Sequence, residues 1–360
     1  MPAITPQPGI MDIALYEGGE SHIDGVADVL KLSSNENPFG ASPEAVAAVA
    51  AAAGQMHRYP STDHVALRRV IGGVHGLDPD RLILGVGSDE LLTLIAQAYA
   101  GPGDEVLYPA HGFSYYPIVA RAAGATPVTA PETERRVDVD ALLAAVTPRT
   151  RLVFVANPAN PTGTMIGAEA VARLAAGLPD RCLLVLDGAY AEYVDGFDGG
   201  AALVDAQDRV VMTRTFSKLY GLGGLRVGWA YAPRDIIDVL NRVRGPFNLS
   251  NVALAGAEAA MRDRAFAETC RTVNASERTR LIRGLRQLGI ACDDSLANFV
   301  LARFADAAEA AATDAHLKSE GILVRRVKGY GFPEALRITV GRPDDVTRVL
   351  SALGRFRGQG

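Results

Sequence analysis

The sequence predicts an α/β fold, with a mainly parallel central sheet covered by helices on both faces and a smaller α+β C-terminal domain. Short apolar runs alternate with helical, Ala-rich stretches, and the runs lack the polar alternation of a sheet with one solvated face. After Asn248 the pattern changes to a long helical region from about residue 252 to 288, followed by strand-like runs around one more helix. The strands predicted for the central sheet cover residues 81–85, 105–108, 152–156, 183–186, 210–213 and 227–231.

The chain is long enough for two domains. Its 360 residues, 48% of them hydrophobic, can bury a sizeable core, and this length exceeds that of one average domain. We expect an N-terminal segment over residues 1–38 that packs with the small domain, a large domain over 39–248 and a small C-terminal domain over 249–360.

Composition argues against several classes of protein. The formal net charge is -5, so no overall positive field favours nucleic acid or an anionic membrane. The three cysteines, Cys182, Cys270 and Cys292, are widely spaced and form no CxxC pair, which argues against a disulfide framework and a zinc site. No run approaches the roughly 18 apolar residues of a membrane span, and the N-terminus has no apolar signal region. We expect a cytoplasmic protein without a metal site.

A glycine-rich turn follows the first predicted strand. The sequence Gly85-Val-Gly-Ser-Asp-Glu90 stands directly before an apolar helical stretch. Free backbone N–H groups at a helix N-terminus suit an anion, and Ser88 and Asp89 would supply them. An ordinary helix cap is the alternative. A dinucleotide-binding turn fits less well, because the glycine pattern is incomplete and the next strand lacks a terminal acidic residue.

Polar residues also follow two later strands. The two Asn-Pro steps in residues 157–163 predict a rigid turn that aims the Asn160 amide into a cleft, with a purely structural turn as the alternative. Asp187 ends the strand 183–186, and Tyr190 follows three residues later. Ligands of open parallel sheets bind at the carboxyl ends of the strands, so we expect these groups to face a ligand.

A lysine lies beside a glycine-rich segment after the strand 210–213. This segment contains Thr215, Ser217 and Lys218, and its glycine-rich stretch ends at Arg226. A lone lysine is usually a solvated surface charge. That interpretation is weaker for Lys218, because it stands between Ser217 and GLGGLR.

Five motifs follow one another along the chain: RYP at residues 58–60, NPANPTG at 157–163, DGAYAEY at 187–193, TFSKLYGLGGLRVGW at 215–229 and LRITVG at 336–341. In order and spacing they resemble the fold type I aminotransferases that use pyridoxal 5′-phosphate (PLP), and most closely the histidinol-phosphate aminotransferases. The resemblance begins at LSSNENPFG near the N-terminus, so it covers almost the whole chain. It implies the fold type I architecture, PLP as the cofactor and a PLP-binding large domain.

The resemblance assigns the catalytic groups. It implies that Lys218 forms a Schiff base with PLP and then acts as the general base on the substrate. Asp187 is implied to pair with the pyridinium nitrogen and keep it protonated. Asn160 and Tyr190 are implied to hydrogen-bond the phenolic oxygen of the cofactor.

Other residues are implied around the cofactor ring and phosphate. Phe113 resembles the aromatic residue that stacks on the ring, with Tyr115 or Tyr116 as alternatives if the register is shifted. Arg226 suits a phosphate because its planar fork makes paired hydrogen bonds. The groups expected around the cofactor phosphate are Ser88, Asp89, Thr215, Ser217 and Arg226.

Tyr59 of the RYP motif resembles a tyrosine that reaches the cofactor phosphate of the other subunit. The resemblance therefore implies a homodimer with shared active sites.

The resemblance also suggests which groups bind the substrate. Arg337 matches an arginine that faces the anionic end of the amino substrate, and Asn35 is placed with the substrate-binding residues. Arg325 and Tyr16 resemble groups that bind the phosphate monoester of histidinol phosphate. Arg326 stays open as an alternative to Arg325, because a shift of one residue turns a strand side chain to the other face.

The implied reaction moves the amino group of glutamate to imidazole-acetol phosphate, giving 2-oxoglutarate and histidinol phosphate in histidine biosynthesis. An aromatic amino-acid aminotransferase on the same scaffold is the alternative, and a threonine-phosphate decarboxylase is a third PLP interpretation. A nucleotide-binding reductase would leave Lys218 and the Asn-Pro motif without a role. The expected partners are small-molecule substrates and a second copy of the chain, not nucleic acid or a membrane.

Overall fold

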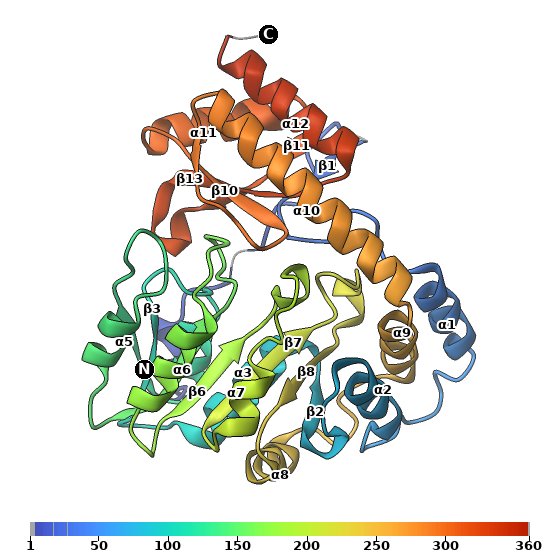
Figure 1. Cartoon of the computed structure of the whole chain (residues 1–360), viewed down its shortest axis with the longest axis vertical. Helices are drawn as coiled ribbons and strands as arrows, with labels where there is room; N and C mark the ends of the chain where they lie inside the picture. The colour runs from blue at the N-terminus through green and yellow to red at the C-terminus, as the bar shows by residue number, and fades with distance from the viewer. Residues whose placement is uncertain (1–3, 17, 27, 359–360) are drawn as a thin grey trace.

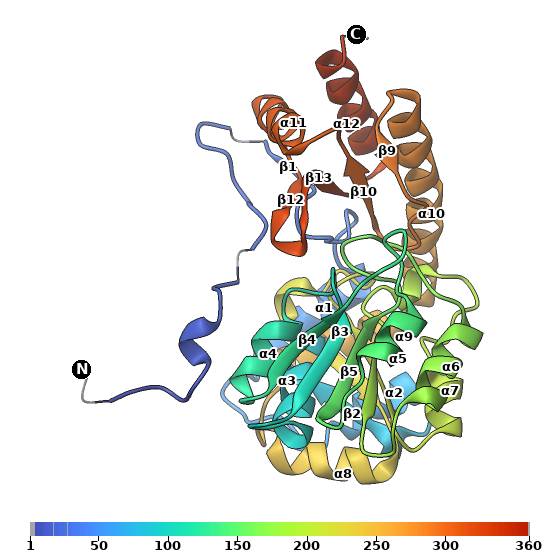
Figure 2. The same cartoon turned by 90° about the vertical axis from the view of Figure 1, so that its left-hand side faces the viewer.

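The computed structural model describes residues 4–16, 18–26 and 28–358. A larger part is built on a seven-stranded sheet, and a smaller part on a four-stranded sheet stands above it (Figure 1). The N-terminal segment runs along the outside of both parts before it enters the small one (Figure 2).

The large sheet is parallel in all strands but one. Its spatial order is β2 (Leu82–Gly85), β8 (Gly228–Tyr231), β7 (Val210–Thr215), β6 (Leu183–Asp187), β5 (Thr150–Ala156), β3 (Glu105–Pro109) and β4 (Thr126–Ala130). β8 is antiparallel to both β2 and β7, and the other neighbours are parallel. β2 therefore runs in the same direction as β7, and the carboxyl ends of β2, β5, β6 and β7 lie at one edge.

Helices cover both faces of this sheet because its strands carry apolar residues on both sides. In β5, Val153 and Val155 belong to one core cluster, and Leu152 and Phe154 to the other. The predicted α/β fold is confirmed. One face packs on α3 (Gly87–Tyr99), α4 (Tyr116–Ala122) and α8 (Arg234–Val243). The opposite face packs on α1 (Pro43–Ala53), α2 (Val65–His75), α5 (Val139–Ala145), α6 (Ala168–Gly177), α7 (Ala201–Ala206) and α9 (Asn251–Arg262).

The helical stretch expected from about residue 252 to 288 consists of two helices. α9 and α10 (Arg264–Gln287) meet at Asp263, whose carboxylate accepts a hydrogen bond from the Phe266 N–H and so caps α10. α9 packs against α1 and α2, whereas α10 continues upward beside the small sheet (Figure 1). The division into residues 1–38, 39–248 and 249–360 stays a prediction. None of the helices in the described ranges is long and apolar enough to cross a bilayer.

The small sheet turns one face to helices and the other to the large part. Along β13 (Phe332–Thr339), Leu336 and Ile338 pack under the helices, so the alternate residue Arg337 points to the other face. β1 (Leu30–Lys31) pairs in parallel with β11 (Ile322–Leu323), which attaches the N-terminal segment to the small part. The other elements here are β12 (Arg325–Val327), β10 (Phe299–Arg303), β9 (Ala291–Cys292), α11 (Ala307–Ser319), α12 (Pro343–Phe356) and the short 3-10 helix η5 (Lys328–Tyr330).

Candidate active site

A cavity of about 500 Å³ lies between the carboxyl edge of the large sheet and the inner face of the small sheet. It collects every site residue predicted from the sequence except Tyr59, although their roles toward a ligand stay predictions. The predicted residues that line it are Tyr16, Asn35, Ser88, Asp89, Phe113, Asn160, Asp187, Tyr190, Thr215, Ser217, Lys218, Arg226, Arg325 and Arg337.

Lys218 follows β7 and extends its amine into this cavity. Its Nζ lies 3.3 Å from the Ser34 carbonyl oxygen and 5.8 Å from the centre of the Tyr190 ring. Burial, together with the nearby Arg337 guanidinium, lowers the pKa of Lys218 to about 8. A sizeable fraction of this amine is therefore neutral near physiological pH, as a nucleophile or a general base requires.

Asp187 is a buried carboxylate at the end of β6. Its Oδ2 accepts a hydrogen bond of 2.9 Å from the Tyr116 hydroxyl, and its Oδ1 accepts one of 3.2 Å from the Ala189 N–H. Burial raises the pKa of Asp187 despite these two bonds. A cation placed against this carboxylate would offset the cost of its burial, so the position fits a protonated ring nitrogen.

The structure distinguishes the three aromatic residues that precede and begin α4. The Tyr116 ring is fully buried and its hydroxyl serves Asp187, whereas the Tyr115 hydroxyl lies 2.9 Å from Thr93 Oγ1. Phe113 lines the cavity with its ring, edge-on to Tyr16 at 6.4 Å between centroids. Tyr115 lines the cavity as well, so the stacking role of Phe113 stays a prediction.

Arg226 is the centre of a polar cluster at the ends of β2 and β7. Its Nη2 donates to Asp89 Oδ1 at 2.8 Å, and its Nη1 donates to Ser217 Oγ at 3.2 Å. Thr215 Oγ1 lies 3.0 Å from the same Ser217 oxygen. Arg226 has a left-handed backbone, with φ of 57°, which is uncommon for a residue with a side chain and frequent at functional sites.

Two glycines let this cluster assemble. Gly87 has φ of 80°, and a Cβ there would collide with the Asp89 carboxylate and the Arg226 guanidinium. A Cβ on Gly228 would collide with the Ser88 nitrogen. The close approach of β8 to the start of α3 brings hydroxyls, a guanidinium and the helix N-terminus together, a combination that suits a phosphate.

Arg337 is a buried cation in the roof of the cavity. Its Nη1 donates to Asn160 Oδ1 at 2.6 Å and its Nη2 to the Ser33 carbonyl at 3.1 Å, while its Nε has no hydrogen-bond partner among the described residues. The ring of Phe299 lies 5.3 Å from the guanidinium carbon. No described carboxylate forms an ion pair with Arg337, so an anionic ligand would supply the missing charge.

Asn35 connects the N-terminal segment to Tyr190. Its Nδ2 donates to the Tyr190 hydroxyl oxygen at 2.9 Å, and its Oδ1 accepts from Thr339 Oγ1 at 3.2 Å. Like Arg226, Asn35 is left-handed, with φ of 55°. This segment therefore forms a wall of the cavity and fixes the position of a predicted catalytic tyrosine.

The strand register distinguishes Arg325 from Arg326. Arg325 pairs with Arg337 across β12 and β13, and directly opposite residues of an antiparallel pair point to the same face. Arg325 accordingly lines the cavity with Arg337, and Arg326 does not.

Tyr59 lies outside the cavity. It is 81% exposed and stacks on Phe247 with 4.5 Å between ring centroids. Within one chain it contacts none of the other predicted site residues.

Two tyrosines of the site were not predicted in the places where they lie. Tyr330 was not expected at all, and Tyr116 was expected only as an alternative to Phe113. Tyr330, in η5, lines the cavity with its phenol, and the Ser114 hydroxyl lies 3.3 Å from its hydroxyl oxygen. Tyr330 carried no local signal, since η5 is a short turn between two strands. Tyr116 had only its position in the aromatic run 113–116 to mark it.

Comparison with known proteins agrees with this geometry. Residues 27–353 match the family described as aminotransferase class I and II. The chain is 74% identical over 355 residues to the histidinol-phosphate aminotransferase of Roseobacter denitrificans, covering 99% of each chain, and 66% identical over 357 residues to that of Ruegeria pomeroyi, with 99% coverage of each. The crystal structure of histidinol-phosphate aminotransferase from Sinorhizobium meliloti in complex with PLP superposes with a TM-score of 0.91 at 29% identity, covering 99% of each chain.

These matches extend over almost the whole chain, and the family resemblance inferred from the sequence motifs is confirmed. The chain belongs to the class I and II aminotransferases, within the family of histidinol-phosphate aminotransferases.

Proposed function

We propose that this chain transfers the amino group of glutamate to imidazole-acetol phosphate, giving 2-oxoglutarate and histidinol phosphate. The observation that carries the proposal is the shared cavity, where the Lys218 amine, the Asp187 carboxylate and the Arg337 guanidinium all open on one space. This space suits an amino substrate with an anionic end. The near full-length identity to histidinol-phosphate aminotransferases selects the phosphorylated substrate.

PLP is the cofactor that these residues fit. Asp187 would hold the protonated ring nitrogen, and Asn160 and Tyr190 would hydrogen-bond the phenolic oxygen. Phe113 would lie against the ring. The cofactor phosphate would be held by the backbone N–H groups of Ser88 and Asp89, the hydroxyls of Thr215 and Ser217, and the guanidinium of Arg226.

The chemistry requires one proton to be moved at the substrate Cα. When bound, PLP supplies an electron sink for the charge left on that carbon. Lys218 would take the proton from the substrate Cα and deliver it to the C4′ carbon of the cofactor. An amine with a pKa of about 8 is suited to this transfer. Asp187 would keep a positive charge on the ring nitrogen, in a site where burial strengthens the pairing.

Two arginines would orient the substrate. Arg337 is buried and held by Asn160 and Ser33. It would bind a carboxylate of glutamate or the phosphate end of the phosphorylated substrate. Arg325 and Tyr16 would contact the phosphate monoester, because a guanidinium makes paired hydrogen bonds to phosphate oxygens. Asn35, which donates to the Tyr190 hydroxyl oxygen, lines the same cavity as these groups.

We further propose a homodimer in which Tyr59 of one copy reaches the cofactor phosphate of the other. Three large apolar residues are exposed in this region: Met56, Tyr59 and Phe247. Met56 is close to Tyr59 in sequence, and Phe247 stacks on the Tyr59 ring. The Arg244 Nη2 donates to the Thr62 carbonyl at 2.7 Å and so connects the segment that carries Tyr59 to the segment that carries Phe247. Exposed apolar surface of this kind is typical of a protein interface.

A transamination assay with the holoenzyme tests the proposal. Glutamate and imidazole-acetol phosphate should give 2-oxoglutarate and histidinol phosphate, and the Lys218→Ala variant should give neither. Phenylalanine should be a poorer donor than histidinol phosphate. Turnover of phenylalanine without histidinol phosphate would instead indicate an aromatic aminotransferase, and release of carbon dioxide from threonine phosphate would indicate a decarboxylase.

A further inference from the structure

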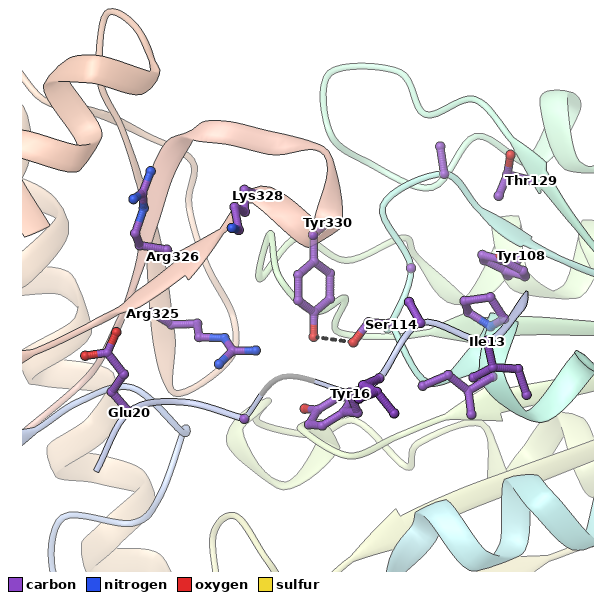
Figure 3. A pocket seen from close by; sticks show the side chains of 18 of the residues that line it. Ile13, Tyr16, Glu20, Tyr108, Ser114, Thr129, Arg325, Arg326, Lys328 and Tyr330 are labelled. Atoms are coloured by element: carbon purple, nitrogen blue, oxygen red, sulfur yellow. Dashed lines mark hydrogen bonds between the residues drawn. The ribbon is translucent and has the colours of Figure 1, made fainter. Parts of the chain in front are cut away.

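A second cavity, of about 660 Å³, opens beside the active site (Figure 3). Its walls are the N-terminal segment before β1, the loop and helix around α4, and the β12–η5 turn. Tyr16, Arg325 and Tyr330 line both this cavity and the active-site cavity, so they mark the passage between the two. We call the second cavity the outer chamber.

The outer chamber is rich in cations although the chain as a whole carries a formal charge of -5. Among its described lining residues, five are basic and two are acidic. These are Arg121, Lys318, Arg325, Arg326 and Lys328 against Glu20 and Asp314.

Both carboxylates of the chamber are already engaged by one lysine. Lys318 Nζ lies 2.8 Å from Glu20 Oε1 and 3.2 Å from Asp314 Oδ2. This group has a formal charge of -1, and the other four cations bring the formal charge of the described lining to +3.

Three of these cations have no ion pair with a described carboxylate: Arg121, Arg326 and Lys328. They come from opposite walls, Arg121 from α4 and the other two from the small part. Arg326 and Lys328 are exposed and come from the same β12–η5 segment as Arg325, with the Arg326 side chain directed to the opposite side of the strand from Arg325 (Figure 3).

Cations around a hollow with low-dielectric walls concentrate small anions and raise the rate at which they bind. Imidazole-acetol phosphate is the oxo substrate of the proposed reaction, and 2-oxoglutarate is the oxo substrate of its reverse. Each carries about two negative charges, the first on its phosphate and the second on its two carboxylates. We infer that the outer chamber is the entry route for these dianions, and that Arg121, Arg326 and Lys328 accelerate their capture. This inference rests on the proposed function and deepens it.

Rapid mixing of the amino form of the holoenzyme with each oxo substrate tests the inference through the cofactor absorbance. The variant Arg326→Gln/Lys328→Gln removes two exposed charges, and Arg121→Gln removes one from the opposite wall. At low salt the second-order rate constants for both dianions should fall by about tenfold in the double variant and by a smaller factor in Arg121→Gln. In the variants these second-order rate constants should depend less on ionic strength than they do in the wild type. The rate at saturating substrate should be the same in the variants and the wild type.

Two controls separate entry from overall charge. Phenylpyruvate carries one negative charge and should slow by less than about threefold. The variant Arg69→Gln/Arg283→Gln removes the same number of exposed charges from α2 and α10, outside the chamber, and should react as the wild type does.

Unchanged capture of the dianions in both chamber variants would overturn the inference, as would slowing of only one of the two dianions. Equal slowing in the Arg69→Gln/Arg283→Gln control would overturn it as well. A wild type that does not react with imidazole-acetol phosphate would instead overturn the proposed function.

Discussion

The lowered pKa of Lys218 should be visible in the cofactor-free protein as an unusual pH dependence of its reaction with amine reagents. An amine reagent attacks only the neutral amine, so the labelling rate of each lysine should follow its own titration. With a pKa of about 8, roughly a tenth of Lys218 is neutral at pH 7, compared with about one in 2,500 for a lysine with the ordinary pKa of about 10.4. Lys218 should reach half its maximal labelling rate near pH 8 and level off above about pH 9.

The chain offers an internal comparison because it contains four lysines. Burial acts to lower the pKa of Lys318, but its hydrogen bonds to Glu20 and Asp314 outweigh burial and raise it. Its labelling rate should therefore still be rising above pH 10. Peptide mapping with mass spectrometry at each pH gives both curves in one experiment.

A variant tests the cause of the shift. Arg337 is the main charged group that lowers the pKa of Lys218, after burial. Arg337→Gln should move the labelling midpoint of Lys218 to higher pH. A wild-type midpoint above pH 10, or no movement in the variant, would refute the argument from burial and charge.

Three further outcomes are expected. Asp187→Asn should retain PLP but lose about two orders of magnitude in kcat, since a buried charge pair contributes about 2–5 kcal/mol; near-normal turnover would remove Asp187 from the mechanism. Mixing Tyr59→Ala with Lys218→Ala subunits should regenerate intact sites and raise activity above that of either variant alone, whereas a fully active monomer in sedimentation would exclude shared sites. At physiological salt, Arg325→Ala should lower kcat/KM for histidinol phosphate by about one to two orders of magnitude and leave phenylalanine little changed, because a hydrogen bond to a charged group contributes about 1.5–3 kcal/mol; an equal loss for both substrates would make Arg325 a general anion binder.

The strands of the large sheet could be predicted where burial is two-sided. All six predicted runs became strands, since each is apolar along its length. The seventh strand, β4, was missed because it lies at the sheet edge and its residues Thr126 to Thr129 are partly exposed, so they carry no continuous apolar signal.

The floor of the site could be predicted because parallel strands end at one edge. Asp187 ends β6 and Lys218 follows the adjacent strand β7, so the topology alone brings them together. The roof depends on pairing between distant segments. The register that places Arg325 beside Arg337 is a property of β12 and β13, and the role of Tyr116 toward Asp187 depends on a contact between residues 71 apart in sequence.

The most direct test of the account is to locate the lysine that binds PLP. Borohydride reduction of the holoenzyme followed by peptide mapping should find the pyridoxyl group on Lys218, in the peptide containing Thr-Phe-Ser-Lys. The same label on Lys31, Lys318 or Lys328, with Lys218 unmodified, would contradict the site described here.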